Sequence, residues 1–576
     1  MFMRVNIAKS KNAEQVYIIR SYRKNGKSTS SIYKKLGTME QLIQEHGSRE
    51  EVLAWANKEA EKETIKYNEA NEIVTIAFNP SNIISKDYNR TYNVGYLFLQ
   101  QLYYDLQINK IMRNIRDRYH FDYDINEITR NLTFSRILDP SSKRSSYEHA
   151  HCFLDKPSYS LDDSYRALSI LAQESDYIQS ELFKNSNFIT KRDVSCLYYD
   201  CTNYFFEIEV DDDFRKYGKG KEHRPNPIVT MGLFMDSKGI PIAFDMYEGS
   251  KNEQLTLKPL EEKVIRSYDI QEFIFCSDSG LASKSNKLLN SIHNRKYVIT
   301  QSLKKMKKDD AEWALNPTQF RQIGRETFID ISKLDESKED VYNNVYYKEI
   351  PGANDDEIII VTYSPKYKYY QQSIREKQIA RAKEWMTTPG KLTRNTQNQN
   401  DPKRFCKEIR TTDQGEVANQ KVFELDIDRI VEEAKYDGFY AVCTNLNDNV
   451  RKVIEINKKR WEIEECFRIL KTDFKARPIY VQRQDRIKAH FLICFIALLI
   501  LRILEEKTGH VYTVTELLAT LRSMNVINVE EHGYIPAYTR TEITDTLHNV
   551  FGFRTDNEII KKAKMRNIIS QTKNKK

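Results

Sequence analysis

Between residues 194 and 303, the chain alternates apolar, β-branched runs with polar turns and segments of helical spacing. The apolar runs predict strands at 194–206, 226–235, 240–247, 272–277 and 296–303. Helical spacing at 254–268 and 283–295 predicts two helices, and Pro259 is expected to bend or split the first. Three successive strands, followed by alternating helices and strands, predict an α/β fold with a mixed sheet and helices on its faces.

The first 190 residues have a mainly helical pattern. Two short β-like runs flank Asn25-Gly26, a pair typical of a hairpin turn. Helical patterns follow at 38–66, 93–118 and 124–138, and Pro140 marks a boundary after the last one. No candidate site chemistry occurs here. We therefore predict a hairpin with helices over 1–70 and a helical binding region over 71–190.

The sheet pattern is interrupted over residues 304–436. This segment contains Lys-rich turns, strand-like runs at 341–350 and 357–363, and a helical pattern near 370–386. It predicts an inserted β-rich domain that divides the core into two parts. We expect the first part of the core at 191–303, its second part at 437–510 and a C-terminal region at 511–576.

Two features near the C-terminus lead to separate predictions. The apolar run within 486–507 is ended by Arg502 and is shorter than the ~20 residues that a membrane span needs. We expect it to pack onto the core or into a partner subunit, with core packing favoured. From Arg554 onward the chain is rich in Lys and Arg, which predicts a mobile basic arm.

Composition narrows the function classes only slightly. The 576 residues are enough for roughly three or four domains. Lys and Arg exceed Asp and Glu by 90 to 82, a formal charge of +8, and 30% of residues are charged. Together with 35 Tyr, this composition suits a surface that covers a phosphate backbone and stacks on bases, but it equally suits an ordinary solvated surface.

Cysteine usage and the N-terminus indicate a compartment. The eight Cys form no CxxC pair and several lie in apolar runs, so we interpret them as buried free thiols in a reducing environment. His149, His151 and Cys152 form a local cluster without a second half at zinc-ligand spacing, which favours a structural role. Because the first residues lack an apolar signal core, we expect a soluble, intracellular protein.

Two aspartates occupy positions where a charge is costly. Asp200 lies within the predicted strand 194–206, and burying its carboxylate requires a charged partner or a metal. Asp278 follows the strand 272–277 and precedes Ser279-Gly280, a place where ligand sites occur in α/β sheets. Taken singly, either residue is also explained as a helix cap or a strand-end turn residue.

A helix predicted over 449–475 supplies a third acid. Its buried stripe is expected to consist of Val453, Ile456, Ile463, Phe467, Leu470 and Phe474. Beside this stripe Asn457, Glu464 and Lys471 recur every seven residues, with Arg460 one turn before Glu464. A salt-bridged helix surface is the plain alternative. Glu465 falls about 100° from Glu464 and is expected to face solvent.

These residue types suit phosphodiester chemistry. Cleavage with two divalent ions needs several carboxylates around metals ~3.5–4 Å apart. Mg²⁺ prefers such oxygen ligands, and cations such as Arg460 and Lys471 would hold the phosphates. We find no convincing Ser/His or Cys/His arrangement for a protein nucleophile.

At this point the motifs resemble a known family. Arg460-xxx-Glu464-xxxxxx-Lys471 resembles the catalytic-helix signature of bacterial insertion-sequence transposases of the DDE type. The segments 198–207 and 277–282, around the two aspartates, are similar to that family's strands. Three further stretches are also similar to the family: 136–143, 218–227 and 239–241. One departure is Asn457, where the family usually has Tyr.

The resemblance implies a fold and an activity. The fold is a ribonuclease-H-like mixed sheet with flanking helices, interrupted by the β-rich insertion and preceded by a mainly helical DNA-binding region. The activity is cleavage and transfer of DNA strands at terminal inverted repeats, with two Mg²⁺ (or Mn²⁺) held by Asp200, Asp278 and Glu464. Asn457, Arg460 and Lys471 would contact DNA phosphates. The implied partners are element ends, target DNA and a second copy of the chain.

Two other functions stay open at the level of sequence. One is a nuclease of the same fold that does not join strands. The other is a DNA-binding descendant of a transposase that has lost its chemistry. Metal-dependent cutting would exclude the DNA-binding descendant, and joining of cut ends would exclude the nuclease.

Overall fold

In the computed structural model the chain forms two compact units. One comprises Met1–Tyr88 with Val529–Gly533, and the other comprises Asn89–Asn528 with Tyr534–Lys576. The structure describes the following residues: 3–10, 13–24, 27–70, 73–218, 220–221, 224–352, 356–387, 401–409 and 422–573.

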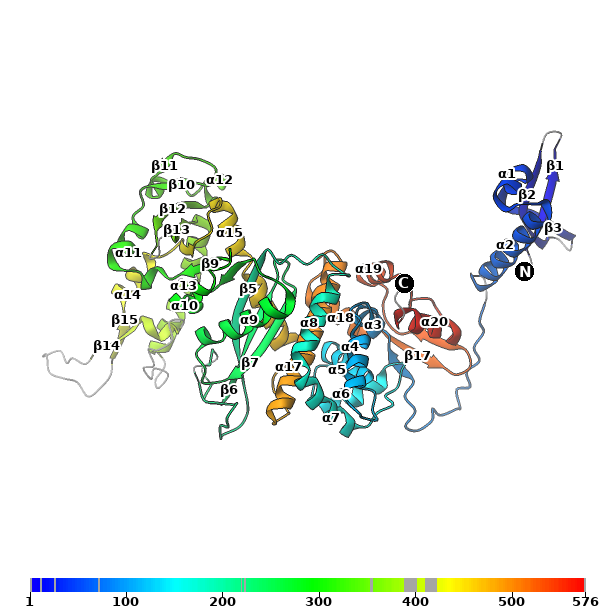
Figure 1. Ribbon diagram of the computed structural model, residues 1–576, viewed down its shortest axis with the longest axis horizontal. Helices are drawn as coiled ribbons and strands as arrows, with labels where there is room; N and C mark the ends of the chain where they lie inside the picture. The colour runs from blue at the N-terminus through cyan, green and yellow to red at the C-terminus, as the bar shows by residue number, and fades with distance from the viewer. Residues whose placement is uncertain are drawn as a thin grey trace. The chain divides into compact units, whose positions relative to one another are not determined.

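The N-terminal unit contains an antiparallel three-stranded sheet (Figure 1). β2 (Glu14–Lys24) pairs on one side with β1 (Met3–Lys9) and on the other with β3 (Lys27–Thr38). β2 and β3 are the two arms of the hairpin expected from the sequence. Its turn, Asn25-Gly26, lies outside the described residues.

Two helices follow this sheet where the sequence predicts one over 38–66. α1 (Met39–His46) begins at a capping box made by Thr38 and Gln41. It ends at Gly47, whose φ of +95° is accessible to glycine but rarely to other residues, and α2 (Arg49–Ala70) begins after it. The helical period is the same on both sides of Gly47, so the pattern alone does not reveal the break.

The larger unit is organised around a ten-stranded mixed sheet (Figure 1). Its strand order is β11-β10-β12-β13-β16-β9-β8-β5-β6-β7. Five of the strands come from the segment in which five were predicted: β5 (Cys196–Phe205), β6 (Ile228–Met235), β7 (Pro241–Glu248), β8 (Ile274–Ser277) and β9 (Lys296–Gln301). The predicted mixed α/β sheet is thus confirmed.

The pairing within these five strands places Asp200, in the middle of β5, beside the end of β8. β5, β6 and β7 form an antiparallel meander. β8 lies parallel to β5, and β9 lies parallel to β8. The carboxyl ends of β5, β8 and β9 therefore meet at one edge of the sheet. Helices α9 (Leu257–Tyr268) and α10 (Lys284–Leu289) lie in the connections between β7 and β9.

Residues 304–436 add strands to the same sheet. β16 (Phe439–Thr444) is antiparallel to β9 and also pairs with β13 (Ile358–Tyr363), so the inserted strands continue the core sheet. The other elements of the insertion are β10 (Phe320–Gln322), β11 (Phe328–Ile329), β12 (Tyr346–Pro351), β14 (Cys406–Ile409), β15 (Val422–Leu425), α11 (Lys308–Leu315), α12 (Glu339–Tyr342), α13 (Pro365–Thr387) and α14 (Ile427–Ala434). The domain boundaries themselves stay predictions.

α17 (Gln484–Lys507) is the central helix of the helical layer and packs against α5, α7 and β7. It is long and apolar enough to cross a membrane, with a mean hydropathy of 2.3, but 94% of its most apolar window is buried inside the protein. Core packing, as favoured from the sequence, accounts for this burial. The neighbouring helices are α3 (Tyr96–Asp105), α4 (Ile108–Arg118), α5 (Ile125–Leu138), α6 (Lys143–His149), α7 (Leu161–Gln173) and α8 (Ser175–Ser186).

The C-terminal residues fold onto this helical layer. α20 (Lys562–Lys573) packs on α3, and Gln100 donates a hydrogen bond of 2.8 Å from Nε2 to Oγ1 of Thr572. The prediction of a mobile basic arm was wrong for this stretch, because Met565 and Ile568 give the basic helix an apolar face. The remaining elements here are α18 (Val514–Ser523), α19 (Glu542–Phe551), β17 (Asn525–Val529), β18 (Gly533–Pro536) and β4 (Thr91–Asn93).

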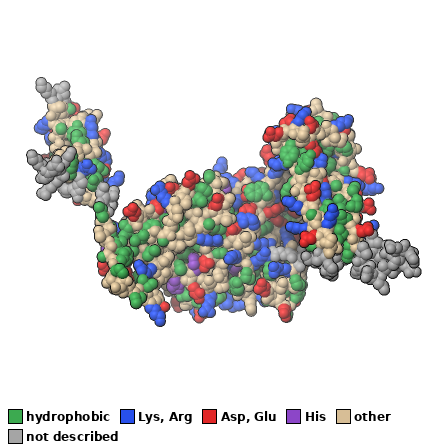
Figure 2. All heavy atoms as spheres, turned by 180° about the vertical axis from the view of Figure 1, so that it is seen from behind, with side chains coloured by type: hydrophobic (Ala, Val, Ile, Leu, Met, Phe, Trp, Pro, Cys, Tyr) green, Lys and Arg blue, Asp and Glu red, His purple; other side chains and the backbone are tan. Residues whose placement is uncertain are grey.

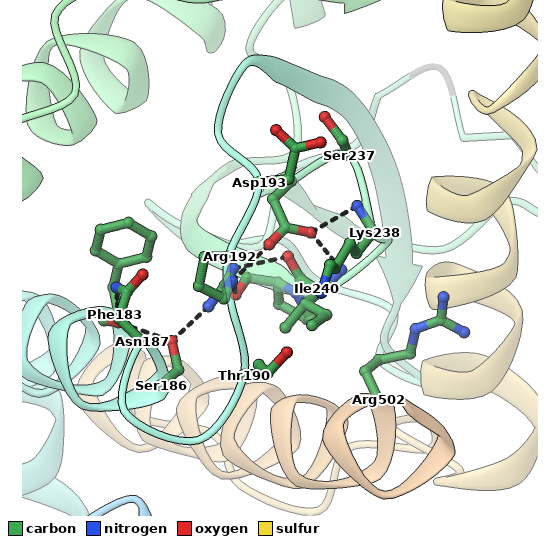
Figure 3. Close-up of polar contacts among 12 residues, drawn as sticks. Phe183, Ser186, Asn187, Thr190, Arg192, Asp193, Ser237, Lys238, Ile240 and Arg502 are labelled. Atoms are coloured by element: carbon green, nitrogen blue, oxygen red, sulfur yellow. Dashed lines mark hydrogen bonds and ion pairs between the residues drawn. The ribbon is translucent and has the colours of Figure 1, made fainter. Parts of the chain in front are cut away.

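A buried ion pair fixes the turn between β6 and β7 (Figure 3). Nε of Arg192 donates to Oδ2 of Asp236 at 2.5 Å, and both side chains are buried. The same guanidinium donates to the carbonyl oxygens of Ile240 and Pro241 and to Oγ of Ser186. Because these buried donors and acceptors have hydrogen-bond partners, the turn is held rigidly against the end of α8.

Candidate active site

Asp200 lies in the middle of the candidate site on β5. It is the one half-buried position in a strand that is otherwise buried. Its Oδ1 accepts a 2.7 Å hydrogen bond from the backbone N–H of Cys201 and lies 3.7 Å from Nζ of Lys221. Burial raises the pKa of Asp200; Lys221 and the backbone N–H oppose this rise, and Asp278 adds to it.

Asp278 lies beside Asp200 at the end of the neighbouring strand. Tyr198 of β5 pairs with Cys276 of β8, so Asp200 and Asp278 each come two residues after a paired position on adjacent parallel strands. Asp278 also caps the short 3-10 helix η3 (Ser279–Leu281), accepting from the N–H of Ser279 at 2.7 Å. The cap explanation therefore applies to Asp278, yet half of its side chain remains exposed for other contacts.

The third acid lies on a helix that the structure divides. α15 (Val450–Lys458) and α16 (Trp461–Arg468) are joined through Lys459 and Arg460, where backbone hydrogen bonds are of the shorter 3-10 type. A π-helix, η7 (Ile469–Asp473), follows directly. The continuous helix predicted over 449–475 was wrong at this junction. The predicted buried stripe is otherwise present, with Ile456 half-buried.

Arg460 connects two of the acids. Its Nη1 lies 3.2 Å from Oε1 of Glu464 and 4.0 Å from Oδ2 of Asp278. Burial lowers the pKa of Arg460, but Asp278, Tyr440, Glu464 and Asp200 together raise it above its ordinary value. Asp278 and Glu464 thus share one guanidinium. Among the described residues, no three His, Cys, Asp or Glu side chains converge on a common point as metal ligands would.

Glu464 and Glu465 differ from the expectation in their exposure. The side chain of Glu464 is 59% exposed, whereas that of Glu465 is 25% exposed. Glu465 is covered because it forms two hydrogen bonds of 2.6 and 2.7 Å with Arg468 on the next turn. The prediction that Glu465 faces solvent more than Glu464 was therefore wrong, while Glu464 does lie on the side of Asp278.

The other two signature residues contact different strands. Asn457 accepts a 3.5 Å hydrogen bond from Oγ1 of Thr300 on β9. Nζ of Lys471 lies 5.6 Å from the ring centroid of Tyr204 on β5. From Asn457 through Arg460 to Lys471, the helical segment therefore contacts β9, the end of β8, and β5 in turn. This order is the order of the strands in the sheet.

Cationic residues that the sequence did not single out lie around the carboxyl half of β5. Lys221 hydrogen-bonds the carbonyl oxygen of Cys201 and lines a groove of about 650 Å³ with Asn203, Glu253 and Gly280. Burial lowers the pKa of Lys221, but Asp200 and Glu253 raise it above its ordinary value. The signal in the sequence is the stretch 218–227, which resembles the family but does not by itself assign a role to Lys221.

Two arginines flank the same strand. The guanidinium of Arg224 lies 4.3 Å from the ring centroid of Phe205, and that of Arg477 lies 5.1 Å from it. Elsewhere, Lys and Arg are interspersed with Asp and Glu over the face seen in Figure 2, as the small net charge suggests. The cations along the carboxyl half of β5 are thus placed by tertiary structure, since Arg224 and Arg477 are more than 250 residues apart.

Comparison with known proteins gives one family. The family model for the transposase DDE domain matches residues 202–500, just over half of the chain. The match includes Asp278 and Glu464 and begins two residues after Asp200. Comparison with curated protein sequences gives no match.

A transposase is among the solved structures that are similar to the chain. It is the piggyBac transposase in a synaptic complex with hairpin DNA, with a TM-score of 0.35 and 9% sequence identity, covering 84% of this chain and 86% of that chain. The family match, which covers just over half of the chain, identifies the protein: the chain belongs to the DDE transposases, enzymes that bind DNA, cut it and transfer it.

Proposed function

We propose that this transposase moves a bacterial insertion sequence by cutting DNA at the terminal inverted repeats and joining the freed 3′ ends to target DNA. The observation that carries the proposal is the matched position of Asp200 and Asp278 on adjacent parallel strands, with Glu464 reaching Asp278 through Arg460. The strand order β7-β6-β5-β8-β9 supports a ribonuclease-H-like core. The cytoplasm, beside the nucleoid, is the proposed location.

The proposed site holds two Mg²⁺ or Mn²⁺ ions, which would have to draw the three carboxylates closer together than they lie in the present arrangement. Asp200, Asp278 and Glu464 offer oxygen ligands of the kind these ions prefer. Burial raises the pKa of Asp200, and cations beside it would restore its charged form. When bound, the ions would activate the attacking oxygen and stabilise the leaving one.

The cationic side chains beside the three acids have a separate proposed role, which is to bind DNA phosphates. Arg460 neutralises Asp278 and Glu464 in the present arrangement, and its planar fork also suits phosphate oxygens. We assign Arg460, Lys471 and Asn457 to the phosphates at the cut. The N-terminal unit and the helical region are proposed to recognise the ends. Since two ends must be held together, a homodimer is the proposed active complex.

The test is cleavage of a plasmid that carries the element's own ends, in Mg²⁺ and in EDTA. Wild type should cut at the ends only in Mg²⁺. Asp200→Asn, Asp278→Asn and Glu464→Gln should bind ends but not cut, while the matched control Glu465→Gln should cut normally. Cutting in EDTA, or by Glu464→Gln, would contradict the proposal.

The same assay separates the other two functions. A nuclease would cut but leave no joined products, and an inactive DNA-binding protein would bind ends without cutting in any divalent metal. The proposal requires joined products from wild type.

A further inference from the structure

A chain of hydrogen bonds leads from β16 across β9 to the helix that carries Arg460. Oγ1 of Thr300 lies 2.7 Å from the hydroxyl of Tyr440 and 3.5 Å from Oδ1 of Asn457. Val442 is the strand partner of Thr300, so Tyr440, two residues earlier on β16, points to the same face of the sheet. Three elements are therefore linked by side chains alone.

The direction of this chain follows from the donors available. A threonine hydroxyl has one hydrogen, and the oxygen of Asn457 can only accept. Thr300 must therefore donate to Asn457, and Tyr440 must donate to Thr300. With its carbonyl oxygen held in this way, Asn457 has its NH₂ group left to donate elsewhere. Without the Tyr440 hydroxyl, Thr300 could rotate and release the amide.

The surroundings place this amide beside the candidate site. Asn457 is one turn before Arg460, and Tyr440 is close enough to Arg460 to raise the pKa of that guanidinium alongside Asp278. The ring of Tyr440 is itself braced by Tyr367 of α13, with ring centroids 6.5 Å apart at 84°. Tyr440, Thr300 and Asn457 are all half-buried, so a ligand at the surface can reach the end of the chain.

We propose that Tyr440 is a positioning residue for DNA binding, which orients the Asn457 amide through Thr300 so that its N–H groups donate to a phosphate oxygen next to Arg460. This inference rests on the proposed function and deepens it, since it assigns a role to a strand that lies beyond the inserted segment. Tyr440 acts on the affinity for DNA ends and not on the chemical step.

The experiment measures the Kd of the full chain for a fluorescent duplex carrying the element's end. Tyr440→Phe and Thr300→Val should each weaken binding about tenfold, since each loosens a hydrogen bond to a charged group. Thr300→Ser, which keeps the hydroxyl, should bind as wild type does. Tyr369→Phe removes a hydroxyl from an exposed tyrosine of α13 and should have no effect.

A double-mutant cycle distinguishes positioning from general damage. If Tyr440 acts through Asn457, the double variant Tyr440→Phe/Asn457→Ala should bind no more weakly than Asn457→Ala alone. At saturating DNA, the single-turnover cutting rate of Tyr440→Phe should stay within about twofold of wild type.

Additive losses in the cycle, or wild-type affinity of Tyr440→Phe, would overturn the inference. Failure of wild type to cut its ends would instead overturn the proposed function, so the two failures are distinguishable.

Discussion

Two arginine–carboxylate clusters lie around α16, and they differ in how completely their contacts are satisfied. Arg502 of α17 is 5% exposed and pairs with Glu462 and Glu505, and it also donates to the carbonyl oxygen of Gly239. Arg460 is 19% exposed, its ion pairs are longer, and its buried Nε has no hydrogen-bond partner among the described residues. The first cluster is closed, whereas the second is open to a ligand.

The Arg502 cluster therefore has a structural role at α16, whereas the Arg460 cluster has the features of a binding site. The Arg502 cluster ties α16 to α17 and to the β6–β7 turn, which Arg192 and Asp236 hold from the other side (Figure 3). It thereby fixes the helix on which Glu464 lies. The Arg460 cluster leaves charges incompletely paired, as expected of groups that exchange partners during binding.

The largest expected effect concerns the closed cluster. Arg502→Met leaves Glu462 and Glu505 without their cation, which should lower the free energy of unfolding by about 3–5 kcal/mol. Chemical denaturation measures this loss. A change below about 1 kcal/mol would show that the cluster does not hold α16 in place.

Replacing the arginine of the open cluster with Met should lower activity strongly and change stability little. Arg460→Met should lower the cutting rate by about 100-fold or more, because a cation at the phosphate is lost. Its free energy of unfolding should change by less than about 1 kcal/mol, since about half of the Asp278 side chain and more than half of the Glu464 side chain are exposed. A loss of stability equal to that of Arg502→Met would remove the distinction between the clusters.

A smaller effect is expected at Gly239. Its φ is +74°, and an added Cβ would lie 2.4 Å from Nη2 of Arg502 and 2.9 Å from Oε2 of Glu462. Gly239→Ala should therefore destabilise the fold by about 1–3 kcal/mol. Gly552→Ala is the matched control, because Gly552 also has a positive φ but nothing lies within 4 Å of its Cβ position. Equal losses would mean that backbone conformation alone is responsible.

The smallest effect concerns Asp200 in the absence of metal. Because burial raises its pKa, the folded state binds the proton more tightly than the unfolded state, and stability is lost as pH rises through the raised pKa. Asp200→Asn should thus raise Tm in EDTA at neutral pH, and this gain should vanish below the unfolded pKa. A lower Tm for the variant at neutral pH would contradict this reasoning.

Local pattern predicted the parts of the site that depend on a single element. Alternation and β-branching located the strands of Asp200 and Asp278, and three- and four-residue steps located the buried stripe beside Glu464. The junction at Lys459 and Arg460 was missed because a 3-10 turn preserves nearly the same spacing.

Contacts between elements could not be predicted in this way. Periodicity gives the face of a helix but not the strand that this face meets, so the contacts of Thr300 with Asn457 and with Tyr440 had no local signal. The exposure of Glu465 depends on where the long side chain of Arg468 lies. Similarly, α20 is strongly basic in sequence, and only its packing on α3 distinguishes it from an arm.

The central claim is that Asp200, Asp278 and Glu464 form one metal site, and Mn²⁺ binding measured by electron paramagnetic resonance tests it most directly. Bound to its DNA ends, wild type should hold about two Mn²⁺ per chain. Asp200→Asn, Asp278→Asn and Glu464→Gln should each lose binding, and Glu465→Gln should keep it. Equal Mn²⁺ binding by Glu464→Gln and Glu465→Gln would contradict the account.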